Sequence, residues 1–118
     1  MTSAELRTGG EWIVEALRAE GVRHVFGLPG VHNLAIYDAL LKQHEITHVI
    51  VVGLLANTCI ESTARFAMEL GYHVTLVRDA TAAYRPEMMH AAHELNGPTF
   101  AHSIVTTAEL VRALEGGN

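Results

Sequence analysis

The sequence predicts an α/β protein: a single three-layer α/β/α domain around a four-stranded parallel sheet. Stretches with apolar residues at helical spacing alternate with short apolar runs along the 118 residues. Continuously apolar runs are typical of parallel strands that are buried on both faces. Alternation at these lengths favours right-handed crossovers, with helices on both sides of the sheet.

The first half of the chain is expected to hold two helices and two strands. An amphipathic helix over residues 10–20 ends at Gly21, and a short strand over 24–27 runs into a turn that contains Pro and Gly. A second amphipathic helix follows over residues 31–44. The run THVIVVGL, residues 47–54, is then expected to form a buried strand.

The second half continues the alternation. Its expected elements are a helix over residues 59–70, a strand over 72–78, a helix over 86–96, a strand over 101–105 and a helix over 107–114. Successive βαβ units usually place neighbouring strands side by side, so the expected strand order is 1-2-3-4, with 2-1-3-4 as the alternative. A chain of 118 residues is long enough for one core, and one domain over residues 1–118 is expected.

Composition excludes several classes of partner. The net charge is −5 with histidine neutral, and a single lysine accompanies seven arginines, so no basic surface for nucleic acid and no polybasic membrane anchor is expected. No apolar run approaches the roughly 20 residues of a spanning helix. The start of the chain lacks the apolar core of a signal peptide, and the single cysteine fits a reducing, cytoplasmic location.

One resemblance covers residues 9–49. The motifs Gly21-Val22, Phe26-Gly27-Leu28-Pro29-Gly30 and Asn33 resemble the start of the pyrimidine-binding domain of thiamine-diphosphate-dependent enzymes. The resemblance implies a glutamate on the following strand, where this chain reads Val51-Val52-Gly53. No cofactor is therefore expected, and residues 27–30 are interpreted as a tight strand-to-helix turn.

A second resemblance covers residues 51–114. The motif GLLANTCIESTA at residues 53–64, with VRDA at 77–80 and HAAHELNG at 90–97, resembles isochorismatase-like cysteine hydrolases. The resemblance implies that Cys59 is the position of the nucleophile. It also implies a cis peptide bond at Leu55–Ala56 and an oxyanion hole that uses the backbone at Ala56.

The residues themselves give partial support to a role for Cys59. The pattern places it at the start of a helix, beyond the carboxyl end of a strand, where ligands bind in parallel α/β sheets. The amino end of a helix favours anions and its N–H groups can hold an oxyanion. The alternative is a small, buried, apolar cysteine without chemistry.

Other candidate residues are interpreted as structural. The resemblance implies a catalytic aspartate and lysine upstream of the cysteine, and this chain has only Asp38 and Lys42 there, four apart on one helix, where they favour an ion pair. His90 and His93 have a spacing that could share a metal ion, but surface or helix-end histidines are favoured and no metal site is expected. His48 and His102 are expected to be structural.

Three functional hypotheses follow. The leading one is an engineered or recombined chimera without native catalysis, in which fragments of about 1–50 and 51–118 are joined in or near residues 49–53. The first alternative is a residual cysteine hydrolase that acts on small amides or activated esters through Cys59. The second is a binding or self-associating module, monomeric or homodimeric, because a small sheet leaves edge strands that can pair with a second copy.

Overall fold

The computed structural model describes residues 6–24 and 32–116. The chain divides into two compact units, Met1–Ile46 and Thr47–Asn118. The division falls close to the boundary near residue 50 that the two resemblances indicate. One domain over residues 1–118 stays a prediction.

The first unit contains two helices, α1 (Gly9–Ala19) and α2 (Leu34–Gln43). Thr8 starts α1 with a reciprocal capping pair: the Thr8 amide donates to Glu11 Oε2 at 2.6 Å, and the Glu11 amide donates to Thr8 Oγ1 at 3.3 Å. Val14 of α1 and Ala39 of α2 are buried. Most of the expected strand over 24–27 and the turn over 27–30 lie outside the described residues.

Gly10 marks a close approach of the two helices in this unit. A Cβ atom built on Gly10 would collide with the backbone carbonyl of Ala35, whereas one on Gly9 meets nothing within 4 Å. Gly10→Ala is therefore expected to lower the free energy of unfolding by about 1–3 kcal/mol, because backbone cannot yield as a flexible side chain does. Gly9→Ala, the matched control, should be neutral or stabilising by up to about 1 kcal/mol. Urea unfolding of both variants checks this, and equal midpoints would contradict it.

The second unit holds a parallel sheet of β1 (His48–Leu54), β2 (His73–Ala82) and β3 (Ser103–Val105), in the order β1-β2-β3. The α/β class and the parallel sheet are thus confirmed. The expectation of four strands is wrong for the described residues, which form three. The three strands lie in the order expected for the last three of the sequence.

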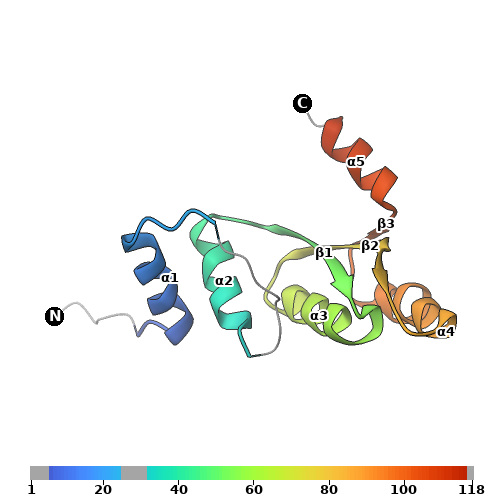
Figure 1. Ribbon diagram of the computed structural model, residues 1–118, viewed down its shortest axis with the longest axis horizontal. Coiled ribbons are helices and arrows are strands. Elements are labelled where there is room, and N and C mark those ends of the chain that lie inside the picture. The colour runs from blue at the N-terminus through green and yellow to red at the C-terminus, as the bar shows by residue number, and fades with distance from the viewer. Residues whose placement is uncertain (1–5, 25–31, 117–118) are drawn as a thin grey trace. The chain divides into compact units, whose positions relative to one another are not determined.

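Helices connect the strands and flank the sheet. The segment after β1 begins as a five-residue π-helical turn, η1 (Ala56–Ile60), and continues as α3 (Glu61–Glu69). After β2 the chain forms α4 (Pro86–His90), η2 (Ala91–Asn96) and η3 (Gly97–Thr99), and α5 (Thr107–Glu115) follows β3. Figure 1 shows α3 and α4 on one side of the sheet and α5 leaving on the other.

The core of this unit lies between α3 and the sheet. Alternate β1 residues point toward it, so that Val51 is buried while Ile50 and Val52 on the opposite face are exposed. The buried cluster consists of Val51, Ile60, Ala64, Val74, Leu76 and Phe100. Burial of these side chains fixes α3, and with it the turn that precedes α3, against the carboxyl half of β1.

β2 is longer than the sequence indicates and continues to Ala82 rather than ending at residue 78. The pairing of β1 with β2 shifts register between Val51 and Gly53, after which Gly53 and Leu54 pair with Thr81 and Ala82. Gly53 has a φ of +114°, a backbone conformation that favours glycine. This irregularity shapes the sheet edge from which the helix carrying Cys59 starts.

Candidate active site

Cys59 lies in the first turns of the helix that follows β1. Leu55, with extended backbone, precedes the helix, and Cys59 is in η1, directly before α3. Its side chain is exposed, and Thr58 Oγ1 donates a hydrogen bond to Cys59 Sγ at 3.8 Å. The structure thus places Cys59 at the carboxyl edge of the sheet, as the sequence predicts, and the alternative of a buried apolar cysteine is wrong.

The cis peptide bond is present, but one residue earlier than expected. It joins Leu54 to Leu55, at the end of β1, and the prediction of a cis bond at Leu55–Ala56 is wrong. Ala56 is buried and begins η1, so its amide belongs to the free amino end of the helix. Its role in an oxyanion hole stays a prediction.

Asn57 is a feature of the turn that the sequence does not reveal. Its Oδ1 atom is buried and, within the described part of the chain, accepts no hydrogen bond. A buried amide oxygen without a donor costs free energy unless another group supplies the donor. Asn57 therefore adds an available acceptor two residues before the thiol.

Glu61, the first residue of α3, forms hydrogen bonds directly after the turn that carries Cys59. Arg65 donates to Glu61 Oε1 from Nε at 3.0 Å and from Nη2 at 2.9 Å, and Asn96 Nδ2 donates to Glu61 Oε2 at 3.3 Å. Arg65 also lies over the ring of Phe100, with Cζ 4.6 Å from the ring centroid. These contacts join the start of α3 to the end of η2, so Glu61 and Asn96 act as positioning residues.

Asp38 and Lys42 form the ion pair that their spacing predicts. Lys42 Nζ and Asp38 Oδ2 are 2.7 Å apart on α2. Both residues belong to the first unit, whereas Cys59 belongs to the second. Within that unit the ion pair links successive turns of one helix.

Asp79 joins β2 to the start of α5. Asp79 Oδ1 accepts from the Thr107 amide at 2.7 Å and from Thr107 Oγ1 at 2.8 Å. These hydrogen bonds hold the pKa of Asp79 below its ordinary value of 3.8. The residue stabilises a helix end and is not directed at Cys59 by any of these contacts.

The lowered pKa of Asp79 predicts a pH-dependent effect on stability. A depressed carboxyl pKa contributes stability that is present above about 3.8 and is lost as the pH falls through the folded-state value. Asp79→Asn should therefore lower the melting temperature at pH 7, and the difference from wild type should narrow below about pH 3. Glu87→Gln, at an exposed ion pair with Arg85, is the control and should change little. If the difference in melting temperature between wild type and Asp79→Asn stays constant down to acid pH, the stabilising role of the ionised Asp79 carboxylate is contradicted.

His90 and His93 lie in different surroundings. His90 is exposed, as expected, but the surface interpretation is wrong for His93, which is only 5% exposed. The His93 ring is used within the fold: Nε2 is 3.1 Å from Thr81 Oγ1, and Nδ1 is 3.1 Å from the Met89 carbonyl oxygen. Residues 6–24 and 32–116 contain no group of three histidine, cysteine or acidic side chains that could hold a metal ion.

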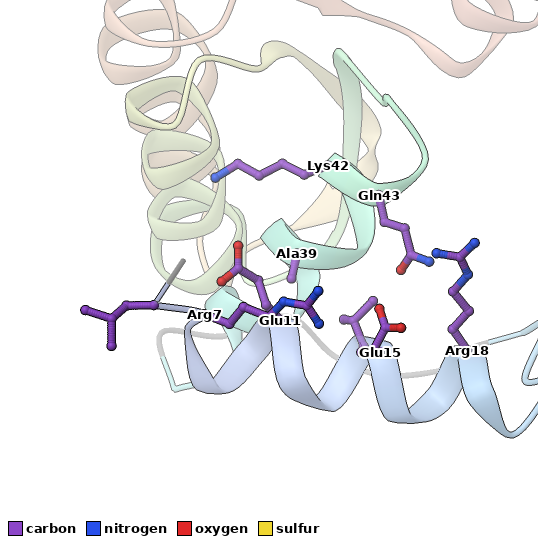
Figure 2. A pocket seen from close by; sticks show the side chains of 9 residues that line it. Arg7, Glu11, Glu15, Arg18, Ala39, Lys42 and Gln43 are labelled. Carbon is purple, nitrogen blue, oxygen red and sulfur yellow. The ribbon is translucent and has the colours of Figure 1, made fainter. Parts of the chain in front are cut away.

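A groove of about 500 Å³ lies in the first unit (Figure 2). Its charged lining residues are Arg7, Glu11, Glu15, Arg18 and Lys42. Basic and acidic groups are mixed, Glu11 is engaged in capping α1 and Lys42 is paired with Asp38. The groove therefore presents no single sign of charge to a ligand.

Thiamine diphosphate does not fit the residues of β1. The strand carries no carboxylate along its whole length, HVIVVGL, to protonate the pyrimidine ring. Val51, at the start of the Val51-Val52-Gly53 stretch, is buried in the hydrophobic cluster instead.

The fold and the position of Cys59 define a class: a parallel α/β protein with an exposed thiol at the carboxyl edge of its sheet. The chain belongs to the isochorismatase family, because the isochorismatase domain model matches residues 36–109, more than half of the chain. The model of the thiamine pyrophosphate enzyme N-terminal TPP binding domain matches residues 7–56. The two resemblances are thus both supported, while a fusion of two fragments is not confirmed.

Curated relatives are similar over most of the chain. Ureidoacrylate amidohydrolase RutB of Methylobacterium radiotolerans is 30% identical over 118 residues, covering 95% of this chain and 45% of the relative. The protein of the same name from Pantoea ananatis is 36% identical, covering 81% of this chain and 40% of the relative. The chain thus spans less than half the length of these relatives.

Solved structures of isochorismatase-like proteins resemble the fold of this chain. An isochorismatase-like hydrolase from Alkaliphilus metalliredigens is 28% identical with a TM-score of 0.63, covering 66% of this chain and 42% of that chain. An isochorismatase family protein from Desulfovibrio vulgaris is 28% identical with a TM-score of 0.58, covering 67% of this chain and 41% of that chain. In the described residues no helix is long and apolar enough to cross a membrane.

These comparisons correct the leading functional hypothesis. The sequence favours an engineered chimera without catalysis because two family resemblances meet in one strand and each lacks the partner residues that its chemistry needs. The comparisons instead find natural hydrolases, one of which aligns with 95% of the chain, and this overturns that hypothesis. The hydrolase alternative is the one that they favour.

Proposed function

We propose that the chain is a cysteine hydrolase of the isochorismatase family that cleaves small amides through Cys59. The observation that carries the proposal is the exposed Cys59 thiol in the first turns of the helix after β1, within the segment that the family model matches. The relatives' description as amidohydrolases supports an amide as the substrate class.

The proposed chemistry follows from the position of the sulfur. The Cys59 thiolate attacks the carbonyl carbon of the amide, and negative charge develops on the carbonyl oxygen. The carbon–nitrogen bond then breaks, and the amine leaves with the proton that the Cys59 thiol released when it formed the thiolate. Water hydrolyses the resulting thioester, releases the carboxylic acid and restores the thiol.

The backbone of the turn supplies the second part of the site. Ala56 begins a helix whose first N–H groups have no partner within the helix, and such groups stabilise an oxyanion when the carbonyl oxygen lies about 3 Å away. We assign this role to the Ala56 amide. Asn57 Oδ1, as a buried acceptor without a donor, is suited to receive an N–H group of the substrate or of a neighbouring residue.

Detection of the thioester tests the proposal. The full chain is mixed with an activated ester such as p-nitrophenyl acetate, quenched in acid and measured by intact-protein mass spectrometry. One acetyl group per chain, mapped to Cys59 and released in hydroxylamine, is the expected result. A chain that stays unmodified, or acetyl groups spread over other side chains, would overturn the proposal.

A further inference from the structure

Three histidines lie side by side at the amino end of the sheet in the second unit. His48 is the first residue of β1, His73 is the first residue of β2, and His102 immediately precedes β3. The ring centroids of His48 and His73 are 4.7 Å apart, and those of His73 and His102 are 4.4 Å apart. The strand register produces this arrangement, because it pairs His48 directly with His73.

The ring of His102 forms part of the pairing between β2 and the segment that leads into β3. The His102 amide donates to the Val74 carbonyl oxygen at 2.9 Å, and the Val74 amide donates to His102 Nδ1 at 3.0 Å. A backbone amide can only donate, so Nδ1 must accept and cannot carry a proton. Protonation of Nδ1 would therefore remove this hydrogen bond.

The neighbours of His73 oppose a positive charge on its ring. Burial lowers the pKa of His73 below its ordinary value of 6.5, and the nearby rings of His102 and His48 lower it further. All three causes act against a charged ring. The helices that pack against the strands, α3 and α5, carry the charged residues Glu61, Arg65, Glu69, Glu109, Arg112 and Glu115.

We propose that His48, His73 and His102 form an acid-sensitive clasp that joins the amino ends of the three strands while the rings are neutral and opens when they become protonated. Neutral rings stack and accept hydrogen bonds. Protonated rings at these separations repel each other, and His102 loses its bond from Val74. The histidine clasp does not depend on the function proposed for Cys59.

The direction of the pH effect follows from the pKa of His73. Its folded-state value lies below 6.5, so the unfolded chain binds the proton more readily. The stability that the neutral ring contributes is fully present above about pH 6.5 and is lost as the pH falls through the folded-state value. The clasp is thus closed at neutral pH and opens in mild acid.

Thermal unfolding of the full chain, followed by circular dichroism between about pH 5 and pH 8, tests the clasp. Wild type should melt at progressively lower temperature below about pH 6.5. His73→Phe keeps a ring in the stack without a titrating group, and His102→Asn keeps an acceptor for Val74. Each should lose about half or more of the acid-induced decrease in melting temperature.

His90→Asn is the matched control, because His90 is an exposed histidine of the same unit outside the stack. His90→Asn should show the same acid-induced decrease in melting temperature as wild type. Equal decreases in His73→Phe, His102→Asn and His90→Asn would overturn the proposal. Should His73→Phe not fold, the wild-type titration of the His73 ring by NMR decides: a midpoint below 6.5 supports the clasp, and one at or above it overturns the clasp.

Discussion

Replacing Cys59 with alanine is expected to reduce hydrolysis of small amides and activated esters by at least about a hundredfold, to near the uncatalysed rate. The exposed thiol is the nucleophile of the proposed reaction, and the helix end around it has no other group of comparable nucleophilicity. Steady-state rates with p-nitrophenyl acetate and with a small amide, compared with buffer alone, provide the measurement.

Thr58→Ala is the neighbouring control. It removes the hydroxyl that donates to Cys59 Sγ at 3.8 Å but leaves the thiol and the helix in place. A long hydrogen bond to sulfur contributes little, so we expect a rate within about tenfold of wild type. Turnover that survives in Cys59→Ala while circular dichroism shows an intact fold would assign the reaction to another residue.

Replacing Phe100 with alanine is expected to lower the free energy of unfolding by about 3–5 kcal/mol, the range for truncation of a buried aromatic side chain. Phe100 is 4% exposed and packs in the cluster that contains Val51 and Val74. The truncation also removes the ring beneath the Arg65 guanidinium. Urea unfolding of the full chain is the measurement. The dependence of the unfolding free energy on urea concentration should be the same in variant and wild type.

Phe100→Leu separates the contribution of the buried side-chain volume from that of the contact between the ring and Arg65. It keeps most of the buried volume and loses the aromatic face, so the expected cost is about 1–2 kcal/mol. A loss of less than about 1 kcal/mol in Phe100→Ala would show that the cluster between α3 and the sheet does not carry the stability of this unit.

The described helices and the three described strands could be predicted from the sequence because period and turn residues act locally. Gly21 and Gly71 end helices and adopt positive φ, where glycine is favoured, and the apolar run before Cys59 forms β1. The length of β2 could not be predicted. It depends on the register shift opposite Gly53, which only the paired strands determine.

Parts of the site depend on tertiary contacts in the same way. The position of Cys59 at the sheet edge follows from the order of elements, so the sequence is enough to predict it. The burial of His93 depends on Thr81, twelve residues earlier in the chain, and its helical spacing from His90 gives no indication of that contact. The stacking of His48 on His73 likewise follows from strand register rather than from any local pattern.

The hydrogen bond from Asn96 to Glu61 has an evolutionary consequence. Because Glu61 also holds Arg65, one carboxylate serves partners from two segments that are remote in the sequence. A substitution of Glu61 or of Asn96 leaves the other residue with an unsatisfied polar group, so the two positions should not change independently during evolution. Among family members, substitutions at the positions of Glu61 and Asn96 should accordingly be correlated, and chains recombined between them should inherit both residues from one parent.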